Sequence, residues 1–174
     1  AFDGPIVGLC GGYQILGERL TGADVEGTGS ASTVDGLGVL PVETHFTTDK
    51  RVERVTRDID GTGPIAGASG TATGYEIHMG RSTATAPVER PLGPESAAID
   101  GVLGTYLHGL FENDGVRNAF INGLFDAADR DPPTASRRPA SDAADGQANG
   151  PSSYDRAAAL VADHVDLAVV DLDL

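Results

Sequence analysis

The sequence contains one cysteine, Cys10, and the residues around it could present it as a nucleophile. Residues 8–12 read Gly-Leu-Cys-Gly-Gly, and this G-x-C-x-G spacing is the thiol version of the nucleophile elbow, a sharp turn between a strand and a helix. Such a turn crowds the positions two before and two after the nucleophile, so only small residues fit there. The backbone N–H groups of Gly11 and Gly12, at the start of the helix, would favour a thiolate and could hold an oxyanion. The alternative is a buried cysteine that acts as a small apolar residue.

A cysteine nucleophile needs a base, and histidine is the usual one. His108 comes directly after the predicted strand within residues 99–107, and strand ends are where α/β enzymes place catalytic groups. His78 lies two residues after Glu76, so a strand would put both side chains on one face. The sequence favours His108 as the base and leaves His78 as the second candidate.

The sequence predicts no metal site. The remaining histidines fit structural roles, His45 as a core or pocket-wall residue and His164 as part of a terminal helix. The spacings H-x-x-H and H-E-x-x-H are absent. A single cysteine also excludes a disulfide framework and a cysteine-based zinc site.

Composition limits the class of protein. The chain has 174 residues, 12 of them basic and 26 acidic, and its formal net charge is −14. This charge disfavours nucleic acid as a partner, because phosphate binding needs clustered positive charge. No apolar stretch is long enough for a transmembrane helix and no signal peptide is apparent, so we expect a cytoplasmic protein without a membrane partner. The acidic excess with a single lysine, Lys50, predicts a protein adapted to high salt.

Hydrophobic patterning predicts a region of strands and helices, followed by a segment without large apolar residues. Apolar periodicity favours helices over residues 13–20 and 113–125. The expected strands cover residues 5–9, 36–42, 44–48, 51–56, 73–79 and 99–107. Residues 126–153 contain no large apolar side chain and read as a flexible acidic linker or insertion. We therefore expect a core over residues 1–125 and a C-terminal helix and tail of the same domain over residues 154–174.

Four ordered stretches resemble the class I, triad-type glutamine amidotransferases, and within them the cobyric acid synthases. The resemblance is carried by residues 8–14 (GLCGGYQ), 36–44 (GLGVLPVET), 74–80 (GYEIHMG) and 104–111 (GTYLHGLF). The stretch that begins at Tyr154 is also similar to the C-terminus of that family. The resemblance implies an α/β fold with a flavodoxin-like, mainly parallel sheet and helices on both faces.

The resemblance also implies a reaction. Cys10 would attack the side-chain amide of L-glutamine, and His108 would act first as base and then as the acid that releases ammonia. Gln14 would help to bind the glutamine. The stretch that contains Tyr75, Glu76 and His78 would line the glutamine site. Ammonia would pass to a synthetase domain, which in this family uses ATP and Mg²⁺ to amidate carboxylates of adenosylcobyrinic acid a,c-diamide, a corrinoid.

Three features depart from the family pattern. Most class I glutaminases have glutamate two residues after the catalytic histidine, whereas this chain has Leu110, and nothing in the sequence places the available Glu76 beside His108. The sequence contains no P-loop and so no visible means of binding ATP; this predicts that the chain itself holds no cofactor. The expected strand–helix structure before the nucleophile is also missing, so we expect an N-terminally incomplete piece of a longer enzyme.

Several other functions remain open from the sequence alone. Related candidates are the glutaminase of cobyrinic acid a,c-diamide synthase and a cell-wall amidotransferase of similar fold. An inactive glutaminase-like fragment and a Cys–His peptidase or amidase are the alternatives of a different class. Gln14 favours the glutaminase.

Overall fold

The computed structural model describes residues 4–25 and 31–131, and the predictions for residues 132–174, including the C-terminal helix, lie outside the described residues. The α-helices are α1 (Gly11–Leu16) and α2 (Asp114–Ala127), and short 3₁₀ turns cover Ala23–Val25, Gly63–Ile65 and Leu110–Glu112. The strands are β1 (Ile6–Leu9), β2 (Arg19–Thr21), β3 (Thr33–Asp35), β4 (Val42–Asp60), β5 (Ser69–Ala84), β6 (Ser96–Ile99), β7 (Val102–Thr105) and β8 (Leu107–His108).

A three-stranded sheet carries the cysteine. Its order is β1-β7-β6, with β1 parallel to β7 and β6 antiparallel to β7. Leu9 at the end of β1 lies opposite Thr105 at the end of β7. The two carboxyl ends therefore meet at one edge, where the chain turns into α1 on one side and approaches β8 on the other.

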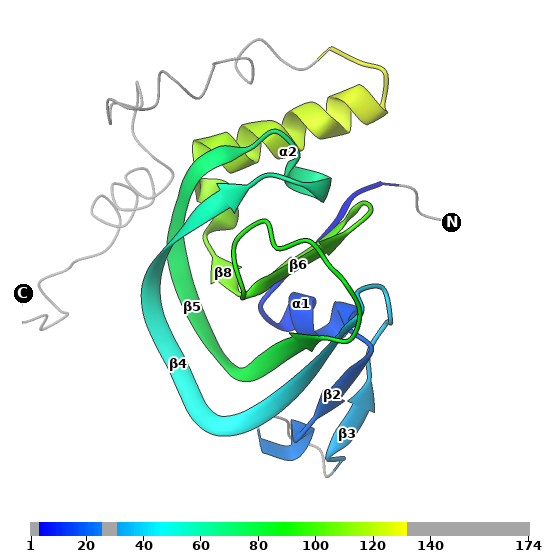
Figure 1. Cartoon of the computed structure of the whole chain (residues 1–174), viewed down its shortest axis with the longest axis vertical. Coiled ribbons are helices and arrows are strands. Elements are labelled where there is room, and N and C mark those ends of the chain that lie inside the picture. The colour runs from blue at the N-terminus through cyan, green and yellow to red at the C-terminus, as the bar shows by residue number, and fades with distance from the viewer. Residues whose placement is uncertain (1–3, 26–30, 132–174) are drawn as a thin grey trace, which may run out of the picture. The chain divides into compact units, whose positions relative to one another are not determined.

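A five-stranded sheet of order β3-β2-β4-β5-β8 surrounds this edge. Its main part is the long antiparallel hairpin of β4 and β5, which curves around α1, β6 and β8 (Figure 1). The hairpin register shifts between Phe46 and Arg51, and a bulge of this kind bends a strand. The curved hairpin places the middle of β5 next to the start of α1 and next to β8.

The expected mainly parallel sheet is not what the described residues form. Of their six pairings between named strands, β1 with β7 and β2 with β4 are parallel, and the other four are antiparallel. The reason is the short connection over residues 61–68, which lets β4 and β5 pair directly, whereas parallel neighbours need a long crossover. Helices on both faces of a parallel sheet are likewise not confirmed, and the architecture shown is a mixed α/β fold with few helices.

Two predicted elements near α1 are wrong in their bounds. The helix expected over residues 13–20 is α1 and ends at Leu16, since Gly17 is extended and the next residues form β2 against β4. The strand expected over residues 36–42 is absent up to Pro41. The backbone N–H groups of residues 37–40 instead donate to carbonyls of Ile15, Leu16 and Gly17, at the end of α1. By contrast, α2 confirms the helix expected over residues 113–125.

Two apolar clusters hold these sheets together. One contains Leu103, Leu107 and Leu110 and receives Val116 from α2. The other packs Tyr13 and Leu16 of α1 against residues that include Tyr106. Both clusters therefore pack around residues 103–110, which lead into and out of the candidate histidine. No helix in the described residues is long and apolar enough to cross a membrane.

Candidate active site

Cys10 stands at a strained turn between β1 and α1. Its backbone has φ 51° and ψ −112°, a conformation that non-glycine residues rarely adopt. The Cys10 N–H donates to the Thr105 carbonyl at 2.9 Å, which ties the turn to the end of β7. The half-buried thiol is thus held in the strand–turn–helix geometry that the sequence predicts for a nucleophile elbow.

The glycines around Cys10 are unequal. A Cβ on Gly8 would lie 2.7 Å from the backbone carbonyl group of Gly12 and 2.6 Å from the Leu16 side chain. A Cβ on Gly12 would meet nothing within 4 Å. A Cβ on Gly104 would overlap the Tyr13 ring, a restriction that sequence reasoning missed. The crowding expected at the elbow therefore falls on Gly8, and on Gly104 of the neighbouring strand.

This asymmetry predicts opposite effects for two matched substitutions. Gly8→Ala should lower the free energy of unfolding by about 1–3 kcal/mol, because the added methyl group overpacks a filled space. Gly12→Ala should leave it unchanged or raise it by up to about 1 kcal/mol, because alanine is the better helix former. Denaturant unfolding of the two variants measures the difference, and equal losses would contradict the crowding assigned to Gly8.

The cysteine and His108 both approach strand β5. The Cys10 Sγ donates to the Ile77 carbonyl at 3.4 Å. His108 on β8 lies opposite Tyr75, two positions from Ile77 on the same strand. Two residues span about 7 Å along a strand. Cys10 and His108 are far apart in the sequence, yet both contact the same short part of β5.

One ring nitrogen of the His108 imidazole makes no hydrogen bond within the described residues. This nitrogen, Nε2, is buried and has no hydrogen-bond partner among residues 4–25 and 31–131. After His108 the chain turns sharply at Gly109, whose φ of 78° suits glycine, and enters the 3₁₀ turn before α2. A buried, unpartnered imidazole nitrogen is a candidate proton acceptor.

Gln14 is buried beside a tyrosine. Its Nε2 donates to the Tyr106 hydroxyl at 3.4 Å, and that hydroxyl is also 2.8 Å from the Ser82 hydroxyl. Ser82 in turn bonds Thr44 at 2.7 Å. Burial raises the pKa of Tyr106, partly offset by the hydrogen bonds from Ser82 and Gln14, and it raises the pKa of Tyr13 to about 12. Both phenols therefore stay protonated at neutral pH.

His78 is held in the core by its ring and by one of its two nitrogens. It is buried, its ring stacks on Tyr106 with centroids 3.8 Å apart, and its Nδ1 lies 2.6 Å from the Gly80 carbonyl, to which it can only donate. Of the other histidines, His45 bonds Thr21 on β2 at 2.9 Å, and His164 lies outside the described residues. The His78 Nε2, like that of His108, is buried and has no hydrogen-bond partner among the described residues, so the ring contacts alone do not choose between the two histidines. Tyr106 itself was not singled out from the sequence, although it lies two residues before His108.

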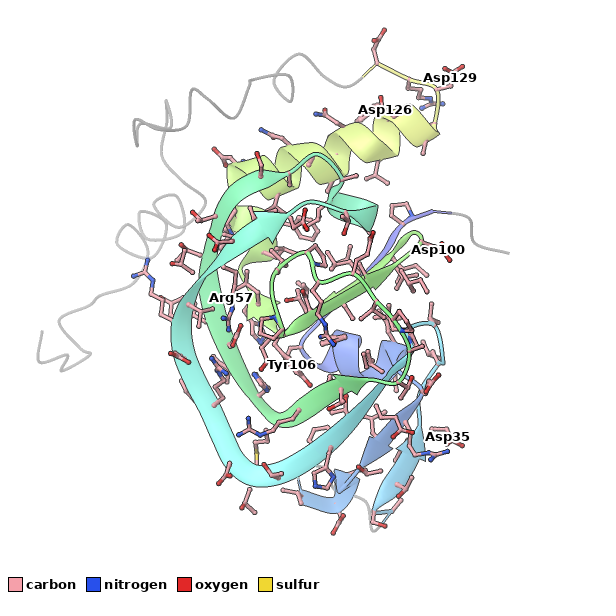
Figure 2. All side chains as sticks on the ribbon, viewed as in Figure 1. Asp35, Arg57, Asp100, Tyr106, Asp126 and Asp129 are labelled. Atoms are coloured by element: carbon pink, nitrogen blue, oxygen red, sulfur yellow. The ribbon has the colours of Figure 1, made fainter. Side chains whose placement is uncertain are left out.

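Glu76 and Tyr75 lie on opposite faces of β5. The Tyr75 side chain is exposed, whereas Glu76 is 1% exposed and accepts two hydrogen bonds from Arg57, at 3.0 and 2.6 Å. Arg51 Nε lies 3.1 Å from the other Glu76 oxygen and Arg51 also pairs with Glu53. Arg57 and Tyr106 both lie on the inner side of the curved hairpin (Figure 2). Glu76 is thus engaged by two arginines, which sequence reasoning did not identify.

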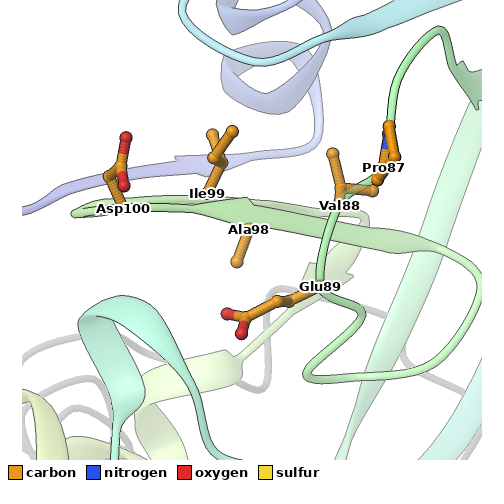
Figure 3. A pocket seen from close by; sticks show the side chains of 6 residues that line it. All are labelled: Pro87, Val88, Glu89, Ala98, Ile99 and Asp100. Carbon is orange, nitrogen blue, oxygen red and sulfur yellow. The ribbon is translucent and has the colours of Figure 1, made fainter.

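The structure shows other features that bear on ligands. The described residues contain no group of three or more His, Cys, Asp or Glu side chains placed to hold a metal ion. A surface hollow lies beside β6 (Figure 3). It is lined by Pro87, Val88, Glu89, Ala98, Ile99 and Asp100. None of the candidate site residues lines this hollow, so it does not belong to the Cys10–His108 site.

The chain is similar to curated proteins that are named cobyric acid synthases. The chain is 55% identical over 168 residues to a probable cobyric acid synthase of Halobacterium salinarum, covering 96% of this chain and 31% of the relative. It is 43% identical over 127 residues to a probable cobyric acid synthase of Methanococcoides burtonii (70% and 25%), and 41% identical over 133 residues to a cobyric acid synthase of Citrobacter koseri (69% and 26%). The chain therefore spans less than a third of the length of these curated relatives.

The family itself follows from a second comparison. The model of the CobB/CobQ-like glutamine amidotransferase domain matches residues 1–116, which include both Cys10 and His108. The match covers the elbow, the long hairpin and β8, which together form the site described above. The chain belongs to the family of CobB/CobQ-like glutamine amidotransferase domains, a family of enzymes.

Proposed function

We propose that this chain is the glutamine-hydrolysing part of a cobyric acid synthase. The observation that carries the proposal is the strained Cys10 turn, whose thiol contacts the strand that also pairs with His108. Cys10 gives its proton to His108 and its sulfur attacks the side-chain carbonyl carbon of glutamine. His108 returns the proton to the departing nitrogen, which leaves as ammonia. Water, activated by His108, then hydrolyses the thioester to glutamate and the free thiol.

The start of α1 supports an oxyanion site. The first N–H groups of a helix have no partner within the helix, and those of Gly11 and Gly12 belong to the first turn after Cys10. They would stabilise the negative oxygen of the tetrahedral intermediate. Gln14 would act on the glutamine through the polar network of Tyr106, while Glu76 and His78 would shape the inner wall and Tyr75 the outer one.

The rest of the reaction belongs to the longer enzyme. Ammonia would pass to a synthetase domain that uses ATP and Mg²⁺ to amidate carboxylates of adenosylcobyrinic acid a,c-diamide. The names of the relatives support this role over the a,c-diamide synthase and cell-wall alternatives. We place the enzyme in the cytoplasm and interpret its net charge of −14 as adaptation to high salt.

The same proposal accounts for the sheet. Within the described residues β1 is the outer strand of the order β1-β7-β6, so one edge of the nucleophile strand is open. Parallel strands from the longer enzyme would complete a flavodoxin-like sheet there, with helices on both faces. In this division residues 1–125 are the glutaminase core, 126–153 a linker and 154–174 the end of the same domain.

Covalent trapping tests the proposed function. The chain in molar salt is treated with a diazo-ketone analogue of glutamine, and the intact mass and the labelled peptide are read. We expect one label on Cys10, blocked by excess glutamine, absent in Cys10→Ala and much slower in His108→Ala. If the chain stays unlabelled, the same assay is run on the longer enzyme; an unlabelled Cys10 there would overturn the assignment.

A further inference from the structure

The side chain of Asn113 binds strand β5 just beyond the point where β8 ends. Its Oδ1 accepts from the Thr73 N–H at 2.9 Å, and its Nδ2 donates to the Thr73 carbonyl at 3.1 Å. Thr73 is two positions from Tyr75, the residue that pairs with His108. Residues two apart on a strand present their N–H and C=O groups to the same edge. The Asn113 amide thus takes the place that the next residue pair of β8 would occupy.

The same amide fastens the turn that follows His108. Asn113 Nδ2 also donates to the carbonyls of Gly109 and Leu110, both at 3.1 Å. Its two hydrogens therefore serve three acceptors, so the amide has no donor left. One side chain joins β5 to the first two residues after His108.

The bonds of Asn113 are unusual for its position. Asn113 is the N-cap of α2, where asparagine normally accepts a hydrogen bond from the helix's own first turn. Here it makes no side-chain capping bond to α2. The residue type suited to capping is therefore used for a different contact, between β5 and the turn after His108.

We propose that Asn113 is a positioning residue that holds His108 in register with Cys10. Cys10 contacts β5 at Ile77 and His108 pairs with it at Tyr75, so their separation depends on how firmly β8 is held to β5. Within the described residues only two register pairs join these strands, and Asn113 supplies the next link. The effect of Asn113 on catalysis rests on the proposed function. Its effect on the placement of His108 is independent of that function.

Two substitutions separate positioning from capping. Serine and aspartate are both good N-cap residues, so Asn113→Ser and Asn113→Asp should be tolerated if Asn113 only caps α2. If it positions His108, both should slow labelling of Cys10 by the glutamine analogue by about 10²-fold, because small misplacements of reacting groups have effects of that size. The control is Asn118→Ala on the same helix, whose side chain makes no hydrogen bond among the described residues; it should label at the unaltered rate.

A second readout works without glutamine chemistry. The imidazole C–H resonance of His108, assigned by its loss in His108→Ala, should shift in both Asn113 variants and stay in place in Asn118→Ala. All variants are compared well below their unfolding temperatures, so that the folded state is observed. An unmoved resonance with unaltered labelling would overturn the inference. An unlabelled parent chain whose His108 resonance still responds would count against the proposed function and for Asn113.

Discussion

Cys10→Ser is expected to lower glutamine hydrolysis by about 10³-fold or more, the largest loss of activity foreseen for any single atom exchange in this chain. The serine hydroxyl has nearly the same size and can occupy the same turn, but it is a far weaker nucleophile than a thiolate at neutral pH. Helix α1 and His108 remain in place. Ammonia release and unfolding temperature measured together separate lost chemistry from lost structure.

The matched control is the double variant with His108→Ala. Residues that act as one unit have non-additive effects, so Cys10→Ser with His108→Ala should be no slower than Cys10→Ser alone. A double variant that loses the product of the two single effects would show that Cys10 and His108 act independently. Unaltered hydrolysis in Cys10→Ser would contradict the role of the Cys10 thiol as the nucleophile.

Glu76→Ala is expected to cost about 2–3 kcal/mol of the free energy of unfolding, because it removes a buried carboxylate that accepts charged hydrogen bonds from the half-buried Arg57. Glu76 is 1% exposed and engages both Arg57 and Arg51. Since small domains have only about 5–15 kcal/mol in total, this variant should unfold at a much lower denaturant concentration. Urea unfolding at fixed salt measures the loss.

Two controls keep that interpretation specific. Glu53 also pairs with Arg51, at 2.8 Å, but its side chain is 56% exposed, so Glu53→Ala should cost at most about 1 kcal/mol. Replacing Glu76 and Arg57 together by methionine should restore much of the stability, because apolar residues can substitute for a buried ion pair. Equal losses for Glu76→Ala and Glu53→Ala would refute the burial argument.

Local signals predicted the strand–turn–helix geometry at Cys10. A short run of apolar residues before Cys10 and small residues after it specify β1, the turn and α1. Each of these elements depends only on residues that are neighbours in the sequence. The helix that begins at Asp114 was likewise visible from its periodicity. What local patterns could not supply is the environment of Glu76, whose arginines come from β4 and reach it only through the register of the hairpin.

The long hairpin shows the same limit. The sequence predicts two short strands with a gap over residues 49–50, whereas the structure has one strand, β4, with a register shift at that place. Polar side chains on a half-exposed strand give little alternation, so the pairing with β5 decides the element. Asn113 was missed for a related reason, since its partner Thr73 is distant in the sequence.

The pairing of β1 with β7 has a consequence for how the chain folds. The β4–β5 hairpin closes over the short connection of residues 61–68, whereas Ile6 must find Val102 at the other end of the described core. A contact between residues far apart in the sequence costs the chain more entropy, because a longer loop must close. Such contacts therefore tend to form late in folding. The turn that presents Cys10 is complete only when both pairings have formed. Refolding chains should therefore pass through species that already hold the hairpin but lack the Cys10 turn, and under the proposed function labelling of the thiol would report the end of folding.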